Sequence, residues 1–99
     1  MQLIHNGIRY NTANSEEVAR ALSASSTSST TVSRWDETLY RTGTGRYFVH
    51  GYGGLGTRWE QSREGILPMS PSDVLAWMKA NKVYVPEECP EVYELVKNA

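Results

Sequence analysis

The sequence predicts an α+β protein in which two antiparallel hairpins form one sheet, packed on one face by two or three short helices. Two turns and one helix start carry this prediction. An Asn-Gly pair at 6–7 and a Thr-Gly-Thr-Gly run at 42–45 each separate β-compatible segments, and a Ser-Pro pair at 70–71 precedes an apolar stripe with helical spacing. With 99 residues, we expect a single domain spanning 1–99 with one modest core.

The first hairpin is expected at about 2–12, because Asn-Gly supplies the two positive φ angles of a type I′ turn. The polar run that follows, from Asn14 to Glu17, resembles a helix start, since Asn or Ser caps free amides and glutamates favour the positive end of a helix. Apolar residues then recur with helical spacing, so we predict a short helix near 15–23. They are Val18, Ala21 and Leu22.

Residues 23–33 form a Ser/Thr-rich tract in which nine of the eleven residues are Ser or Thr. Such a tract buries little apolar surface, and its hydroxyl groups compete with regular secondary structure. We therefore expect a flexible loop, with a polar adhesive surface as the alternative interpretation.

The second hairpin is expected at about 35–52. If Gly43 and Thr44 are the turn residues, alternation of side chains assigns two faces to it. The face expected on the core holds the pairs Trp35/Tyr52, Glu37/His50, Leu39/Phe48 and Arg41/Arg46. The face expected on the surface holds the pairs Tyr40/Tyr47, Thr38/Val49 and Asp36/Gly51.

The C-terminal third predicts two more helices. Ser70 is a cap, Pro71 occupies the first helical position and Asp73 completes a variant capping box, so we expect a helix over 71–81. Pro90 opens a final helix near 90–97 that is expected to close an edge. The segment between them, at 83–85, has extended character.

The composition excludes several classes of protein. The net charge of −1 gives no general attraction to nucleic acid or membrane, and no apolar window is long enough for a membrane span. The start of the chain lacks the features of a secretory signal, so we expect a cytoplasmic protein. Cys89, His5 and His50 are too few ligands for a structural zinc site, and we expect neither metal nor cofactor.

Two motifs invite a chemical interpretation. Gly51-x-Gly53-x-x-Gly56 matches the dinucleotide-binding fingerprint formally, but that fingerprint requires a strand followed by a helix, whereas the motif here follows an antiparallel hairpin. We therefore favour a turn in which aromatic side chains crowd the backbone.

Glu37 and His50 are expected to face each other, and this pair lacks a credible third catalytic member. We interpret it as a structural cross-strand pair and expect no enzyme activity.

Arginines adjoin aromatic residues at four places between Arg34 and Trp59. Protein interfaces are enriched in these residue types, and we predict that partner binding uses Tyr40, Arg41, Arg46 and Tyr47, followed by Arg58 and Trp59. Nucleic-acid binding by an Arg/aromatic sheet face is the alternative, although seven Arg against five acids over 1–63 is a small positive excess. A homodimer that buries the tyrosine face is a third interpretation.

Three segments together resemble a family of small proteins carried by phages and mobile elements. These segments are NGIRYNT at 6–12, ETLYRTGTGRYFVHGYGG at 37–54 and ILPMSPSDVLAWMKAN at 66–81. Some proteins of this type are regarded as anti-CRISPR candidates. The resemblance implies a counter-defence protein of phage or mobile-element origin, acting in the cytoplasm of a bacterial host by stoichiometric binding to a CRISPR effector. Relatives carry an aromatic segment where this chain has its Ser/Thr tract, so the same partner is not implied.

Overall fold

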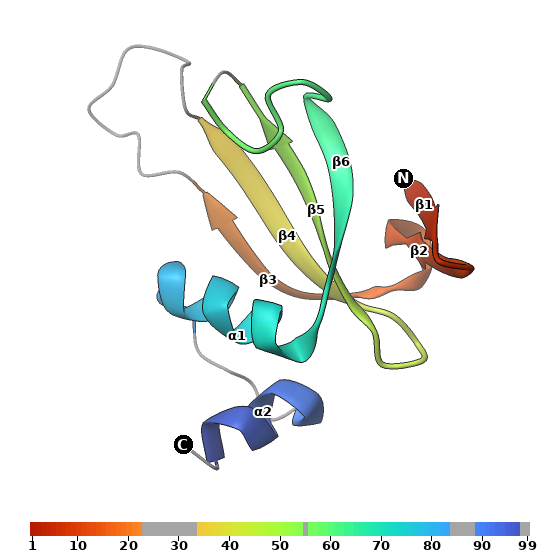
Figure 1. Ribbon diagram of the computed structural model, residues 1–99, viewed down its shortest axis with the longest axis vertical. Helices are drawn as coiled ribbons and strands as arrows, with labels where there is room; N and C mark the ends of the chain where they lie inside the picture. The colour runs from red at the N-terminus through yellow and green to blue at the C-terminus, as the bar shows by residue number, and fades with distance from the viewer. Residues whose placement is uncertain (23–33, 55, 84–88, 98–99) are drawn as a thin grey trace. The chain divides into compact units, whose positions relative to one another are not determined.

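A computed structural model of the protein describes residues 1–22, 34–54, 56–83 and 89–97. It contains two antiparallel sheets and two short helices, which confirms the predicted mixture of α and β structure (Figure 1). The chain divides into two compact units, Met1–Pro68 and Met69–Ala99. The predicted loop at 23–33 lies outside the described residues.

The elements follow one another with the strands first and the helices last. In chain order they are β1 (Gln2–His5), β2 (Ile8–Asn11), the 3-10 turn η1 (Thr12–Asn14), β3 (Glu16–Leu22), β4 (Trp35–Arg41), β5 (Tyr47–Gly53), β6 (Glu64–Met69), α1 (Pro71–Ala80) and α2 (Pro90–Lys97).

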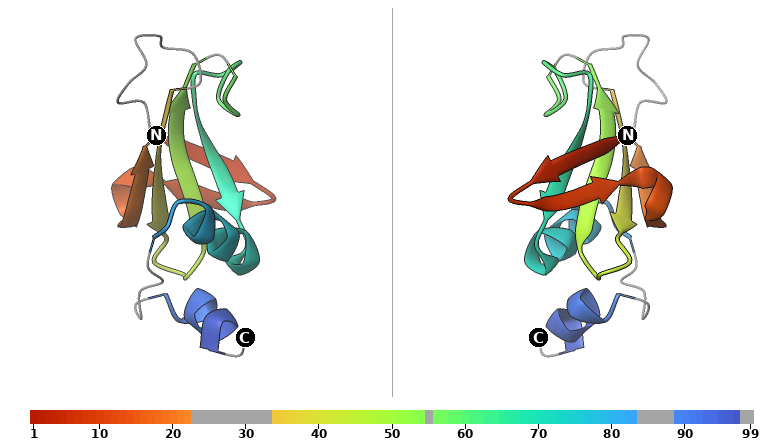
Figure 2. Two further views of the ribbon diagram at one scale, coloured as in Figure 1. Left: turned by 90° about the vertical axis from the view of Figure 1, so that its left-hand side faces the viewer. Right: turned by 90° about the vertical axis from the view of Figure 1, so that its right-hand side faces the viewer.

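The β1–β2 hairpin confirms the predicted turn. Asn6 and Gly7 have φ angles of 52° and 75°, as a type I′ turn requires. The pair forms a sheet of its own, and the other four strands form a second sheet in the order β3-β4-β5-β6. The expectation that both hairpins belong to one sheet is therefore wrong. The small sheet lies across the large one (Figure 2), where the Tyr10 ring meets the Phe48 ring edge-on with centroids 5.6 Å apart.

The helix predicted near 15–23 is wrong, because this segment forms strand β3. It pairs with β4 along its length, and a β-bulge between Glu17 and Ala19 shifts the register by one residue. The bulge removes the strict alternation that identifies a strand in a sequence and leaves apolar residues at helical spacing. Backbone pairing with β4 then outweighs the local helix preference.

The loop between β4 and β5 has one residue more than predicted. Thr42 N–H donates to the Arg46 carbonyl at 2.8 Å, and Gly45 N–H donates to the Thr42 carbonyl at 3.0 Å. Gly45 has a φ angle of 87°, which closes a three-residue loop in the left-handed conformation. The pairing between the strands is therefore shifted by one residue from the predicted register.

This shift exchanges the faces of β5 while β4 keeps its predicted orientation. We name the two faces of the large sheet by their members, which follow from the register. The inner face holds Glu37, Leu39, Tyr47, Val49 and Gly51, all of which are buried. The outer face holds Glu17, Arg20 and Leu22 of β3, Asp36, Thr38 and Tyr40 of β4, Phe48, His50 and Tyr52 of β5, and Glu64 of β6.

The second unit confirms both C-terminal helices. The Ser70 hydroxyl accepts from Asp73 N–H at 3.1 Å, and the Asp73 carboxylate accepts from Ser70 N–H at 3.1 Å, which completes the predicted capping box of α1. Helix α2 begins and ends where predicted. The extended segment predicted at 83–85 falls largely outside the described residues. Neither described helix has the length and apolar content needed to cross a lipid bilayer.

Candidate functional site

The two tyrosines predicted to form a docking face lie on opposite faces of the sheet. Tyr47 belongs to the inner face and is only 2% exposed. Tyr40 belongs to the outer face, is half-buried, and stacks on the Phe48 ring with centroids 5.2 Å apart and planes 9° from parallel. The predicted exposed Tyr40/Tyr47 pair is therefore wrong, because the three-residue loop moves Tyr47 away from Tyr40.

The two arginines of the hairpin end are separated in the same way. Arg41 faces Tyr47 on the inner face, and its guanidinium carbon lies 5.9 Å from the centroid of that ring. Arg46 is exposed in the loop, where its backbone N–H donates to the Thr42 hydroxyl at 3.0 Å. They are not cross-strand partners, so the two charges do not form the predicted pair.

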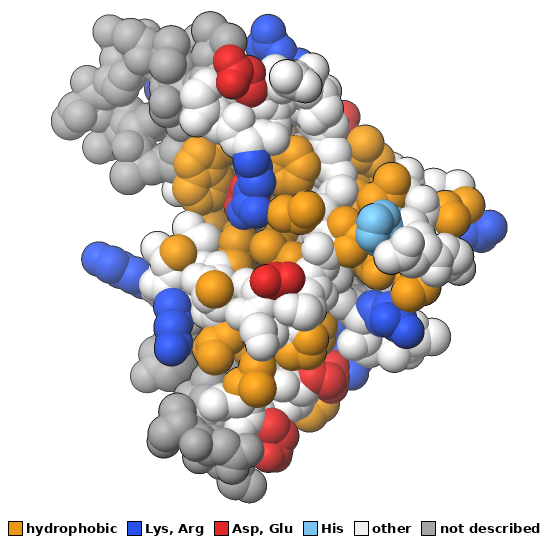
Figure 3. Space-filling view, viewed as in Figure 1, with side chains coloured by type: hydrophobic (Ala, Val, Ile, Leu, Met, Phe, Trp, Pro, Cys, Tyr) orange, Lys and Arg blue, Asp and Glu red, His pale blue; other side chains and the backbone are white. Residues whose placement is uncertain are grey.

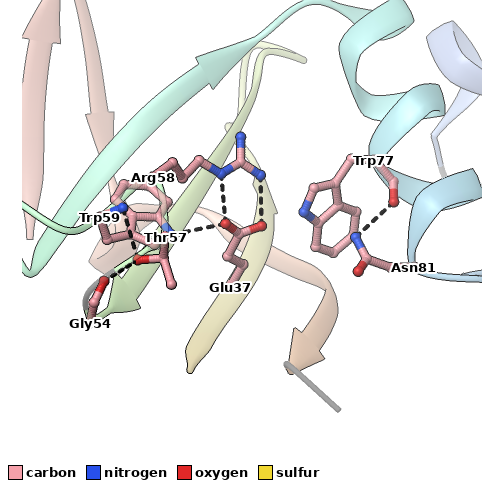
Figure 4. A network of polar contacts seen from close by, with 7 residues as sticks. All are labelled: Glu37, Gly54, Thr57, Arg58, Trp59, Trp77 and Asn81. Atoms are coloured by element: carbon pink, nitrogen blue, oxygen red, sulfur yellow. Dashed lines mark hydrogen bonds and ion pairs between the residues drawn. The ribbon is translucent and has the colours of Figure 1, made fainter. Parts of the chain in front are cut away.

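Glu37 and His50 do not pair, which corrects the predicted structural pair. Glu37 lies opposite Gly51 and is 4% exposed. Its carboxylate accepts two bonds from Arg58, at 2.7 Å from Nε and 2.8 Å from Nη2, and a third at 2.9 Å from the indole N–H of Trp59 (Figure 4). A buried carboxylate needs such partners, since desolvation without them is costly. Arg58 and Trp59 thus belong to a structural network, and Trp59, at 5% exposure, is not a surface residue.

The glycine-rich segment provides space for the Trp59 ring. A Cβ atom added to Gly51 would lie 2.3 Å from this ring, and one added to Gly53 would lie 3.0 Å from it. This crowding confirms that an aromatic side chain presses on the backbone here, but Gly51 and Gly53 belong to strand β5 and not to the predicted turn. The dinucleotide fingerprint is excluded, because the next regular element is strand β6 instead of a helix.

His50 pairs with β6 on the outer face. Its Nε2 lies 2.7 Å from an oxygen of Glu64, and the His50 side chain is 11% exposed. The Tyr52 ring meets the imidazole edge-on, with centroids 4.9 Å apart. Partial burial, together with the Glu64 charge and a hydrogen bond to it, raises the pKa of Tyr52.

A row of three residues crosses the outer face next to this group. Leu22, Asp36 and Tyr52 are consecutive cross-strand partners on β3, β4 and β5. Leu22 is 60% exposed and Tyr52 is 48% exposed. Asp36 between them accepts hydrogen bonds from two guanidinium nitrogens of Arg20, Nε and Nη2, and this hydrogen bonding holds the pKa of Asp36 below its ordinary value.

We name this set the Tyr52 surface. It comprises Arg20, Leu22, Asp36, His50, Tyr52 and Glu64.

Comparison with protein-family models, curated proteins and solved structures gives no match. Within the described ranges, no three His, Cys, Asp or Glu side chains come close enough together to hold a metal ion.

The sequence pattern does not reveal this surface, for two reasons. A loop with two turn residues, as predicted, places Tyr52 on the core. Arg20 and Leu22 were expected on a helix, because the bulge in β3 hides the strand alternation. The one available indication was the second glycine of the loop, Gly45, since a left-handed residue there predicts a three-residue loop.

Proposed function

We propose that this protein acts by stoichiometric binding to another protein through the Tyr52 surface. The observation that carries the proposal is the exposure of two large side chains, Leu22 and Tyr52, on either side of Asp36 in one row of the sheet. Tyrosine and arginine are enriched among the residues that contribute most to binding energy at protein interfaces. The bonds from Arg20 to Asp36 and from His50 to Glu64 order this surface in advance, which lowers the entropic cost of docking.

The resemblance to small phage and mobile-element proteins supplies the class of partner. We propose a counter-defence role in which the partner is a host defence protein, specifically a CRISPR effector that is blocked without turnover. The Tyr52 surface replaces Tyr40 and Tyr47 as the centre of the proposed contact. Arg46, which is exposed in the β4–β5 loop, keeps its predicted role as a further contact.

Nucleic-acid binding has less support. Arg20 and Arg58 are both engaged by carboxylates, so neither guanidinium is free for a phosphate group. On the side drawn in Figure 3, charged side chains of both signs are interspersed with apolar ones among the described residues. A groove that follows a phosphate backbone needs a continuous positive surface.

An interference assay tests the counter-defence role. Bacteria with an active CRISPR system are transformed with a targeted plasmid, with and without this protein. We expect the wild-type protein to restore transformation and Tyr52→Ala to abolish the effect. Tyr93→Ala is the matched control, because Tyr93 is 37% exposed on α2, outside the Tyr52 surface. Both variants are checked for native circular dichroism.

A titration with the purified effector distinguishes binding from catalysis. A stoichiometric inhibitor abolishes effector activity at one equivalent, and calorimetry gives the same ratio. Inactivation by far less than one equivalent would identify an enzyme instead. Equal activity of the wild type and Tyr52→Ala would refute the assignment of the Tyr52 surface, and failure of the wild type in every CRISPR type tested would refute the counter-defence role.

A further inference from the structure

The outer face of the large sheet carries more negative than positive charge. Among the strand residues assigned to this face, Glu17 and Asp36 are placed by the register, Glu64 by its contact with His50, and Arg20 carries the positive charge. Three carboxylates and one arginine among these strand residues give a formal charge of −2, with His50 not counted. This acidic balance is opposite to the positive excess of the N-terminal part of the chain, where residues 1–63 hold seven Arg against five acids.

One of the three carboxylates on this face is paired with an arginine, and among the described residues the other two are not. Arg20 binds both oxygens of Asp36, so these two charges largely cancel. Glu17 is exposed, and the Glu64 side chain, which lies 2.7 Å from His50 Nε2, is 42% exposed. The negative charge available to a partner therefore comes from Glu17 and Glu64.

Tyr52 lies close to one of these available carboxylates. Glu64 lies 2.7 Å from the His50 imidazole, and the Tyr52 ring meets the same imidazole with centroids 4.9 Å apart. The Tyr52 ring is nearly half exposed. A cationic side chain placed on the Tyr52 ring would be attracted both by the face of the ring and by the Glu64 carboxylate. An arginine fits best, because its flat guanidinium stacks on a ring while its N–H groups reach a carboxylate.

We infer that the Tyr52 surface takes a basic, arginine-bearing surface of the partner protein, with an arginine of the partner stacked on Tyr52 beside Glu64. This inference rests on the proposed function and adds the chemistry of the partner. Polyanions are repelled by the same carboxylates, so nucleic acid is not the occupant.

A peptide titration followed by NMR tests the inference. The probe is a blocked Gly-Arg-Gly-Arg-Gly peptide, compared with the same peptide carrying Glu in place of Arg. We expect the arginine peptide to shift the resonances of Tyr52 and its neighbours, and to bind more weakly as salt rises from about 50 mM to about 300 mM. Equal shifts with both peptides, or shifts confined to other surfaces, would overturn the inference, as would an oligonucleotide bound at Tyr52.

Charge-neutralising variants provide a matched comparison. Glu17→Gln/Glu64→Gln removes the two available charges and should weaken peptide binding about fivefold. Glu16→Gln/Glu60→Gln removes the same number of charges elsewhere, since Glu16 pairs with Arg41 of the inner face and Glu60 lies in the β5–β6 connection. This control should bind the peptide like the wild type, and equal weakening in both double variants would contradict the inference.

The outcomes separate this inference from the proposed function. If Tyr52→Ala loses interference inhibition while Glu17→Gln/Glu64→Gln binds the effector like the wild type at every salt concentration, the docking surface stands and its preference for a basic partner is refuted. If the arginine peptide binds at Tyr52 but the wild-type protein inhibits no defence system, the preference stands and the counter-defence role is refuted.

Discussion

Gly51 has no side chain, and the Trp59 ring occupies the space that a side chain would fill. Its Cβ would lie 2.3 Å from the Trp59 ring, so Gly51→Ala must displace the indole that donates to Glu37. We expect a loss of about 1–3 kcal/mol, and thermal denaturation should show a fall in Tm of about 5–15 °C. Gly43→Ala is the control, because no atom lies within 4 Å of its Cβ position. Equal Tm values for the two variants would contradict this account.

The buried carboxylate shows where prediction from the sequence works for single residues and where it does not. Glu37 was expected to pair with His50, and its carboxylate accepts instead from Arg58 and Trp59. The partner itself was predicted wrongly, since Glu37 faces Gly51 instead of His50. The type of neighbour follows from the physical chemistry of a buried charge, whereas its identity depends on loop geometry.

Helix α1 depends on its N-terminal cap. Ser70→Ala removes the side-chain oxygen that accepts from Asp73 N–H, which should destabilise the protein by about 1 kcal/mol. Urea unfolding followed by circular dichroism measures this difference. Ser72→Ala is the control, because Ser72 lies in the first turn, is exposed and is not the cap residue. A loss as large for Ser72→Ala would show that the cap is not the cause.

Strands β3 and β4 are linked by an ion pair that responds to acid. The hydrogen bond from Arg20 holds the pKa of Asp36 below its usual value of 3.8, so the unfolded chain takes up this proton more readily than the folded one. The stabilisation is complete above the usual pKa and is lost as the pH falls through the lower folded value. Urea unfolding at several pH values should show the difference between the wild type and Asp36→Asn shrinking below about pH 4. A difference that stays constant from pH 6 to pH 2 would contradict the assignment.

Among the elements, those with local signals were predictable and those set by long-range pairing were not. The Asn6-Gly7 turn and the Ser70 capping box are encoded within a few residues, and both form as predicted. The Thr-Gly-Thr-Gly loop fits either two or three turn residues, and only φ at Gly45 distinguishes them. Strand β3 lacks a local signal because its bulge disrupts alternation. Strand β6 was missed because it contains Pro68, which is tolerated at the sheet edge that β6 occupies.

Over the whole molecule, resistance to local opening should follow the sheet order. Strands β4 and β5 have a bonded neighbour on each side, whereas β1 and β2 have only each other. A two-stranded sheet is marginal in water, so its amides should exchange with deuterium well before those of β4 and β5. Hydrogen exchange followed by NMR measures the order. Protection of β1 and β2 as strong as that of β4 would contradict it.

The length of the β4–β5 loop also constrains how this chain can evolve. Deletion of one residue among positions 43–45 would leave a two-residue turn. Each side chain of β5 would then lie on the opposite face of the sheet. His50 and Tyr52 would then be directed into the interior, and Tyr47 and Val49 would face solvent. Natural variants should therefore tolerate substitutions in this loop far better than insertions or deletions. The length of one short loop thereby determines which side chains of β5 are exposed to solvent.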